Sequence, residues 1–294
     1  MANLLKRRLK KLTMFLSKVL IAIAIIYVLI CLALWSNQRK MMFFPNAILR
    51  NTPADFGLAY EDVWLMPESE SQNGQVHGWW IPNQFTGNRA NPVILFLHGN
   101  ASNIGDMVSR AQTFHQWGVS TLLIDYRGYG RSSGPFPGEQ QVYEDAEAAW
   151  QYLVERGVSA DRIVIYGQSI GGAIAINLAA NHPEAAGLVV ESSFTSMREM
   201  VRVQKTLPLI PVNWLLTQRF ESLEKVRSLQ MPLLFIHGTA DRVVPVGMSE
   251  QLYDAAPNEK TRVLIEGAGH NDSPLVNPDL YWNSIRTFIE QSVT

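Results

Sequence analysis

Short aliphatic runs alternate with segments of helical periodicity from about residue 75 to the end of the chain. Runs such as VILFL and TLLID have no polar alternation, which is typical of strands covered on both faces of a parallel sheet. The succession of strand and helix predicts a doubly wound α/β fold, in which ligands bind at the carboxyl ends of the strands. The pattern predicts strands at 76–81, 93–97, 121–125, 162–166, 187–191, 233–237 and 262–265, and helices notably at 142–156, 173–181 and 248–256.

One connection between predicted strands is much longer than the others. Segment 194–231 contains no predicted strand and includes the apolar run TLPLIPVNWLL at 206–216. A connection of this length predicts a small lid over the strand ends. Two interpretations of 206–216 remain open: it packs onto the sheet as a cap, or part of it lines an acyl pocket or touches a bilayer.

The first 40 residues follow a different pattern. Residues 19–35 are uncharged and apolar, close to the minimum length for a membrane-spanning helix. Before them, Leu5, Leu9, Leu12 and Leu16 fall on one face of a basic helix, which we expect to lie on anionic lipid before the chain turns into the membrane. We expect Trp35 and the cluster MMFF at 41–44 at the opposite interface.

Charge separates the chain into two unlike parts. Residues 1–40 carry eight basic and no acidic side chains, whereas the remainder carries 17 basic and 26 acidic, a net charge of −9. Six of the basic residues precede the uncharged run, so the positive-inside rule predicts a cytoplasmic N-terminus and an extracytoplasmic domain, periplasmic in a bacterium. A cleaved signal peptide is the main alternative, although no small-x-small cleavage site follows the run, and a buried core helix is another.

Composition excludes several classes of protein. The 294 residues are 47% hydrophobic, which is ample for a buried core. The single cysteine, Cys31, excludes a disulfide framework and a zinc site built from several thiolates. The overall net charge of −1 argues against a nucleic-acid-binding domain. No His or carboxylate cluster has metal-ligand spacing and no glycine-rich phosphate loop occurs, so we expect neither a metal nor a cofactor.

A serine lies at the junction between a predicted strand and a helix of small residues. Ser169 is the centre of GQSIG at 167–171, directly after the strand RIVIY. Glycines two positions before and after a serine permit the sharp turn of a nucleophile elbow. The pentapeptide alone is a weak signal, but the flanking strand and helix make it much stronger.

Two further residues follow later strands in the order that such a serine requires. A serine hydroxyl needs a base to remove its proton, and the base needs a third group to orient it. Asp241 follows the strand LLFIH and His270 follows RVLIE. We therefore predict a triad of Ser169, His270 and Asp241. Glu191, which ends another predicted strand, is the alternative acid.

The same chemistry requires backbone donors for an anionic tetrahedral intermediate. The amide of Ile170 follows the serine at the positive end of the next helix. The turn after VILFL reads HGNASN, and we predict that the Asn100 amide is the second donor.

These motifs resemble those of the α/β-hydrolase superfamily, most closely the group described as Bem46-like or ABHD13-like, with serine-peptidase-like relatives. The resemblance spans roughly residues 40–294 and rests on LFLHGNASN, IDYRGYGRSSG, YGQSIGG, ESSFTSM, HGTADRVVP and EGAGHND. It implies a mostly parallel eight-stranded sheet, a Ser-His-Asp triad and hydrolysis of an acyl bond; some relatives remove palmitate from protein cysteines. It also implies a structural role for His98, and we expect Asp125 and Arg127 to hold the DYRGYG loop together.

These expectations combine into one hypothesis. A basic N-terminus and anchor at 1–38 precedes an α/β-hydrolase domain at 39–294, with a small helical lid at about 195–230. The expected function is that of a membrane-anchored serine hydrolase that cleaves a carboxylic ester or an acyl thioester. Its expected partners are the lipid bilayer and a small acyl ester, lipid or acylated-protein substrate, and no nucleic acid. The alternatives are a peptidase or amidase with the same triad, and a non-catalytic membrane scaffold on a hydrolase fold.

Overall fold

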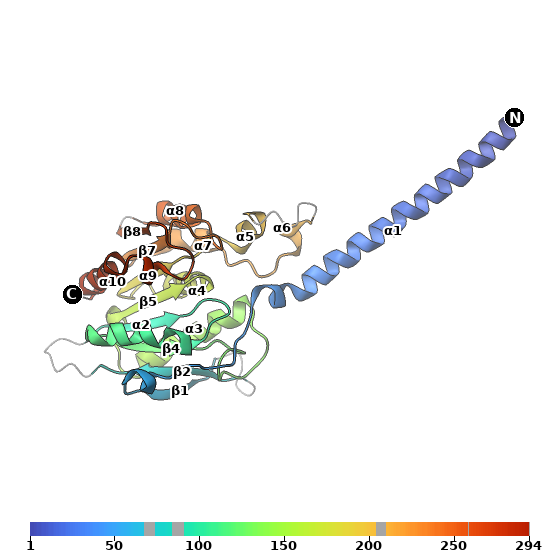
Figure 1. The fold of residues 1–294 in the computed structure, drawn as a ribbon. Helices are drawn as coiled ribbons and strands as arrows, with labels where there is room; N and C mark the ends of the chain where they lie inside the picture. Colours follow the sequence, from blue (N-terminus) through green and yellow to red (C-terminus); the bar gives the residue numbers. More distant parts are fainter. Residues whose placement is uncertain (68–73, 84–90, 204–209, 258, 294) are drawn as a thin grey trace.

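Eight strands form one sheet in the order β1-β2-β4-β3-β5-β6-β7-β8 (Figure 1). The computed structural model describes residues 1–67, 74–83, 91–203, 210–257 and 259–293. Strand β2 pairs antiparallel with β1 and with β4, and the remaining neighbours are parallel. The strands are β1 (Glu61–Leu65), β2 (Val76–Ile81), β3 (Val93–Leu97), β4 (Ser120–Ile124), β5 (Ile163–Gln168), β6 (Gly187–Glu191), β7 (Leu233–Gly238) and β8 (Lys260–Ile265).

The prediction of a mostly parallel eight-stranded sheet is confirmed. Each of the seven strands predicted from apolar runs is present, with ends that differ by at most two residues. Strand β1 is the one that the apolar runs did not indicate. It begins with exposed Glu61 and Asp62, and only Val63 and Leu65 are buried. An edge strand that is half exposed leaves no continuous apolar run in the sequence.

Helices cover both faces of the sheet, and successive strand residues pack on opposite faces. In β3, Leu95 and Leu97 belong to the core under α3 (Glu139–Glu155), α4 (Ile170–Asn181) and α8 (Val246–Ala255), whereas Ile94 and Phe96 belong to the core under α2 (Ile104–Gln116) and α10 (Pro278–Ser292). This alternation is the period of two expected of a strand. The inner strands are therefore buried on both sides, and the loops that follow the parallel strands lie at the carboxyl end of the sheet.

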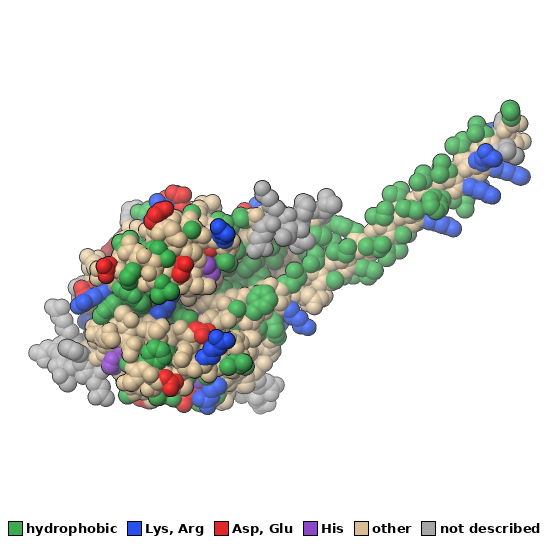
Figure 2. Space-filling view, viewed as in Figure 1, with side chains coloured by type: hydrophobic (Ala, Val, Ile, Leu, Met, Phe, Trp, Pro, Cys, Tyr) green, Lys and Arg blue, Asp and Glu red, His purple; other side chains and the backbone are tan. Residues whose placement is uncertain are grey.

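The N-terminal segment is one unbroken helix, α1 (Ala2–Met42), which projects away from the domain (Figure 1). In the described part of the chain, α1 is the one helix that is long and apolar enough to cross a membrane. Lys and Arg side chains gather near its N-terminal end and hydrophobic side chains cover the length beyond (Figure 2). The sequence from 2 to 42 contains no Gly or Pro, and Pro45 follows the helix end. The predicted turn between a lipid-surface helix and a spanning helix is therefore wrong.

The end of α1 packs onto the domain. The helix passes residue 38, where sequence analysis places the boundary of the anchor, and ends at Met42. Phe43 is 2% exposed and its ring centroid lies 6.3 Å from that of Phe220. The expectation that the whole MMFF cluster lies at a membrane interface is therefore wrong for Phe43, which is part of the hydrophobic core.

In its described residues, the long connection between β6 and β7 carries three short α-helices and one 3-10 helix, Val226–Ser228. The α-helices are α5 (Met197–Val203), α6 (Val212–Leu215) and α7 (Ser222–Lys225). Residues 206–209 of the apolar run lie outside the described residues. In the described remainder, Trp214 of α6 is 90% exposed. We refer to the described residues of 195–230 as the lid.

Candidate active site

Ser169 lies at the turn between β5 and α4 in a conformation that side chains rarely adopt, with φ of 56° and ψ of −120°. Its amide donates to the Glu191 carbonyl at 2.8 Å, and its carbonyl accepts from the Ser193 hydroxyl at 2.8 Å. A Cβ at Gly171 would collide with the Leu97 carbonyl of β3, so only glycine permits α4 to begin so close to the sheet. The turn therefore raises the serine above the end of the sheet.

The three residues predicted as a triad lie together at the carboxyl ends of β5, β7 and β8. His270 Nε2 lies 3.0 Å from Ser169 Oγ, and His270 Nδ1 lies 2.7 Å from Asp241 Oδ2. Both distances are those of hydrogen bonds. The imidazole is thus positioned to accept the serine proton, with its other nitrogen held by a carboxylate.

Asp241 is held in its ionised form by several donors. Its Oδ1 accepts from the Val243 and Val244 amides at 2.8 and 2.9 Å, and its Oδ2 lies 3.1 Å from His237 Nε2. Burial raises the Asp241 pKa, but hydrogen bonds with His237, His270 and the Val244 amide outweigh burial and hold the pKa well below its ordinary value. The carboxylate therefore remains charged opposite His270 at neutral pH.

His237 is a supporting residue that sequence reasoning did not identify. Besides its contact with Asp241, its Nε2 donates to the Val244 carbonyl at 3.0 Å, and its side chain is fully buried. The only signal in the sequence is its place at the end of strand β7, four residues before Asp241. That spacing matches no motif by itself.

The two predicted oxyanion donors flank the serine. In the described part of the chain, the amides of Ile170 and Asn100 donate to no other residue, and both residues line the same cavity as Ser169. A Cβ on Gly99 would lie 3.3 Å from Ser169 Cβ, so the turn that carries Asn100 is adjacent to the serine. An anionic oxygen above Ser169 would thus meet free backbone N–H groups.

The Asn100 side chain fixes this turn to the end of α1. Its Nδ2 donates to the Met42 carbonyl at 2.5 Å, and its Oδ1 accepts from the Phe44 amide and the Tyr129 hydroxyl, each at 2.9 Å. The side chain therefore has a structural function that is separate from the predicted function of its backbone amide.

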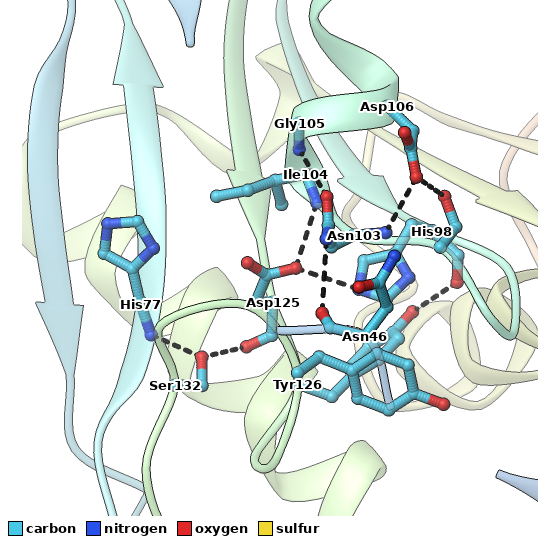
Figure 3. A network of polar contacts seen from close by, with 12 residues as sticks. Asn46, His77, His98, Asn103, Ile104, Gly105, Asp106, Asp125, Tyr126 and Ser132 are labelled. Atoms are coloured by element: carbon cyan, nitrogen blue, oxygen red, sulfur yellow. Dashed lines mark hydrogen bonds and ion pairs between the residues drawn. The ribbon is translucent and has the colours of Figure 1, made fainter. Parts of the chain in front are cut away.

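Buried polar residues support the turn from behind (Figure 3). His98 Nδ1 donates to the Gly99 carbonyl at 2.8 Å, and the Tyr126 hydroxyl donates to the His98 carbonyl at 3.0 Å. Asp125 accepts from the Ile104 amide at 2.9 Å. Arg127 pairs with Asp145 at 2.6 Å. His98, Asp125 and Arg127 are not among the lining residues of the cavity that contains Ser169. Asp125 joins the loop after β4 to the start of α2, and Arg127 joins the same loop to α3.

Glu191, the alternative acid, is engaged elsewhere. It is fully buried and pairs with Arg110 at 2.6 Å, and it accepts from the Tyr166 and Tyr281 hydroxyls at 2.7 and 3.0 Å. Burial raises its pKa, but Arg110 and these hydroxyls lower it below the ordinary value. Because Asp241 occupies the position beside His270, the alternative assignment of Glu191 is wrong.

A cavity of about 460 Å³ opens above Ser169, within the range typical of small-molecule sites. Its walls come from the end of α1, from the loops after the strands and from the lid. Among the described residues that line it, four side chains are polar or titratable: Gln38, Asn100, Ser169 and His270. The others are apolar: Leu34, Trp35, Met41, Met42, Phe44, Ala101, Ile170, Phe194, Met197, Met200, Val201, Ile210, Val212, Leu215, Leu216, Val243 and Val244.

Three kinds of comparison with known proteins identify the family of the chain. A family model described as "Serine aminopeptidase, S33" matches residues 88–225 and 220–272. An uncharacterised protein of Mycobacterium tuberculosis is 36% identical over 88% of this chain and 89% of its own length, and the protein bem46 of Schizosaccharomyces pombe is 29% identical over 90% of each. The structure of an esterase of Pyrococcus furiosus superposes with a TM-score of 0.71 at 22% identity, covering 85% of this chain and 97% of that chain. The chain therefore belongs to the α/β-hydrolase superfamily, in the family of the serine aminopeptidase S33 model.

Proposed function

We propose that the protein is a membrane-anchored serine hydrolase that cleaves a carboxylic ester or an acyl thioester through an acyl-enzyme intermediate. One observation carries the proposal: Ser169 Oγ lies 3.0 Å from His270 Nε2 at the base of an apolar cavity, and Asp241 holds the other nitrogen of His270. A hydroxyl, an imidazole and a carboxylate in this order make a serine nucleophilic.

The reaction proceeds in two halves. Ser169 Oγ attacks the acyl carbon while His270 takes the hydroxyl proton, and the resulting oxyanion lies between the Ile170 and Asn100 amides. The bond to the leaving oxygen or sulfur then breaks, and His270 gives that atom the proton. Water attacks the acyl-enzyme with His270 again as base, which releases the carboxylic acid and restores the serine.

The character of the cavity favours an acyl ester or thioester over a peptide. An aminopeptidase binds the free ammonium group of its substrate, and burial of that charge requires a carboxylate partner. The described residues that line the cavity include no Asp, Glu, Lys or Arg. An uncharged acyl group fits these walls without leaving a charge unpaired.

The function is tested with the full chain in detergent. Ser169→Ala is expected to abolish labelling by a fluorophosphonate probe and hydrolysis of p-nitrophenyl butyrate, whereas Ser284→Ala, on α10, leaves both unchanged. Undiminished labelling of Ser169→Ala would exclude this serine as the nucleophile. A wild-type chain that neither reacts with the probe nor hydrolyses the ester would favour the non-catalytic scaffold instead.

The proposed topology places the N-terminus in the cytoplasm and the hydrolase domain outside it. It is supported by the basic residues that precede the uncharged part of α1. Alkaline phosphatase fused after Thr294 is expected to be active in a bacterial host. An inactive fusion would contradict the orientation, and a mature chain that lacks residues 1–40 would identify a cleaved signal peptide.

A further inference from the structure

The anchor helix forms one wall of the cavity that contains Ser169. Five residues in the last turns of α1 line it: Leu34, Trp35, Gln38, Met41 and Met42. Lid residues, among them Val212 and Leu215 of α6, lie on another side. A substrate bound at Ser169 therefore has α1 on one side and the lid on another.

Hydrogen bonds fix the end of α1 in this position. The Gln38 side chain accepts from the Thr217 amide at 2.8 Å and donates to the Leu215 carbonyl at 3.3 Å. Arg39 Nε donates to the Pro137 carbonyl at 2.8 Å. The wall that α1 contributes is thus attached to the domain on two sides.

The length of α1 predicts that this wall lies near the surface of a bilayer. Lys18 and Arg39 bound the uncharged part of α1, and the rise from Lys18 to Gln38 is about 30 Å at about 1.5 Å per residue, the thickness of a hydrocarbon core. The α1 residues that line the cavity, from Leu34 to Met42, therefore lie on both sides of the point where α1 leaves the hydrocarbon core. Trp35 is 52% exposed and Trp214 is 90% exposed, and tryptophan is enriched at membrane interfaces.

The polar groups in the cavity wall are mostly occupied by the protein. The Gln38 side chain is bonded to the lid backbone, and the Asn100 side chain is bonded to the backbone at Met42 and Phe44. Of the polar side chains among the described lining residues, Ser169 and His270 are the two that we assign to the reacting group. The walls thus suit a long hydrocarbon chain and offer few partners to the backbone of a peptide.

We propose that the substrate is a long-chain acyl ester of a lipid in the same membrane, whose acyl chain enters the cavity along α1. This inference rests on the proposed function, because Ser169 and His270 carry out the hydrolysis. Water cleaves the ester bond, the fatty acid receives the hydroxyl oxygen and the lipid alcohol receives the proton. The anchor then serves both to hold the enzyme at the bilayer and to guide the substrate.

The test uses the full chain in vesicles of phosphatidylethanolamine and phosphatidylglycerol with radiolabelled palmitoyl chains. Leu34→Trp places a larger side chain in the wall and so narrows the cavity. Leu32→Trp is the matched control, because it makes the same substitution at an exposed position of α1 that does not line the cavity. Palmitate release and hydrolysis of p-nitrophenyl acetate are measured for each. We expect Leu34→Trp to lower the ratio of palmitate release to acetate hydrolysis by about tenfold, and Leu32→Trp to leave it unchanged.

Each other outcome overturns a defined part of the proposal. If the wild type hydrolyses p-nitrophenyl acetate but releases no palmitate from the vesicles, the lipid substrate is excluded while the proposed function stands. Release from a palmitoylated peptide in the same vesicles, without release from phospholipid, would identify an acylated protein instead. If the ratio of palmitate release to acetate hydrolysis falls equally in both tryptophan variants, the narrowing of the cavity is excluded as the cause of the fall. If the wild type hydrolyses neither substrate, the proposed function itself fails.

Discussion

Asn100 joins α1 to the turn beside Ser169, because its side chain donates a hydrogen bond of 2.5 Å to the carbonyl of Met42, the last residue of α1. The same side chain accepts from the Phe44 amide. The backbone of Asn100 belongs to the turn beside Ser169. A displacement at the end of α1 would therefore be transmitted to the predicted oxyanion donor.

Removal of this connection should impair turnover. In Asn100→Ala the turn loses its bonds to Met42 and Phe44, so its amide no longer has a fixed position, and we expect kcat to fall by about 10–100-fold. Tyr129→Phe is the matched control, because it removes one bond to the same oxygen and leaves the connection to α1. The measurement is kcat for p-nitrophenyl butyrate. An unchanged kcat in Asn100→Ala would show that the connection does not position the donor.

A methyl group at Gly171 should disrupt the elbow. Its Cβ would collide with the Leu97 carbonyl and lie 2.6 Å from the His98 carbonyl, so Gly171→Ala must move α4 away from the sheet. At Gly247 of α8 no atom lies within 4 Å of such a Cβ, and Gly247→Ala should stabilise the domain by about 0.5–1 kcal/mol. Thermal unfolding and probe labelling compare the two variants. If the two variants have equal Tm values and equal labelling, the close packing of α4 on β3 at Gly171 is contradicted.

The stabilisation from Asp241 should depend on pH. The pKa of Asp241 is lower in the folded chain than in the unfolded chain, so its ionised form stabilises the fold. This stabilisation is complete above the unfolded pKa of about 3.9, and it is lost as the pH falls toward the pKa of the folded chain. The difference in Tm between the wild type and Asp241→Asn should therefore be larger at pH 7 and 5 than at pH 3. Asp279→Asn, at an exposed position, controls for the loss of one carboxylate. A difference in Tm that grows toward low pH would contradict a lowered pKa for Asp241 in the folded chain.

Glu191 should contribute to stability and not to the proton transfer. Glu191→Gln leaves the Arg110 charge buried without its partner, which costs about 3–5 kcal/mol. The exposed pair of Glu290 and Arg286 contributes less, and Glu290→Gln should cost about 1 kcal/mol or less. Denaturant unfolding measures both. Folded Glu191→Gln should still hydrolyse p-nitrophenyl butyrate, and complete loss of activity without loss of stability would restore Glu191 as a candidate acid.

The parts of the fold that sequence predicts well are those with a local signal. Strand β3 is buried at every position, so its five residues form a continuous apolar run. Ser169, Asp241 and His270 each follow such a run, and the carboxyl ends of parallel strands meet at one edge of the sheet. Strand β1 lacks that signal because exposed acidic residues begin it.

The attachment of α1 to the domain has no local signal. The hydrogen bond between Gln38 and Leu215 joins residues that are 177 positions apart in the sequence. The Gln38 side chain bonds to the backbone of Leu215, so the identity of residue 215 gives no signal for this contact. Helical periodicity identifies the apolar length of α1 but does not specify which segment its end contacts. His237 is similar, because its contact with Asp241 depends on how the loop after β7 folds back.

The continuity of α1 gives the domain a fixed azimuth around the helix axis. Because Gln38 and Arg39 attach the helix end to the lid and to the loop before α3, the domain cannot rotate independently of the apolar part of α1, which we propose spans the bilayer. Each residue inserted between Lys18 and Leu34 would turn the whole domain by about 100° and displace it by about 1.5 Å. Seven inserted residues would nearly restore the original azimuth, about 10 Å further along the axis. The length of the anchor thus sets the direction in which the cavity faces.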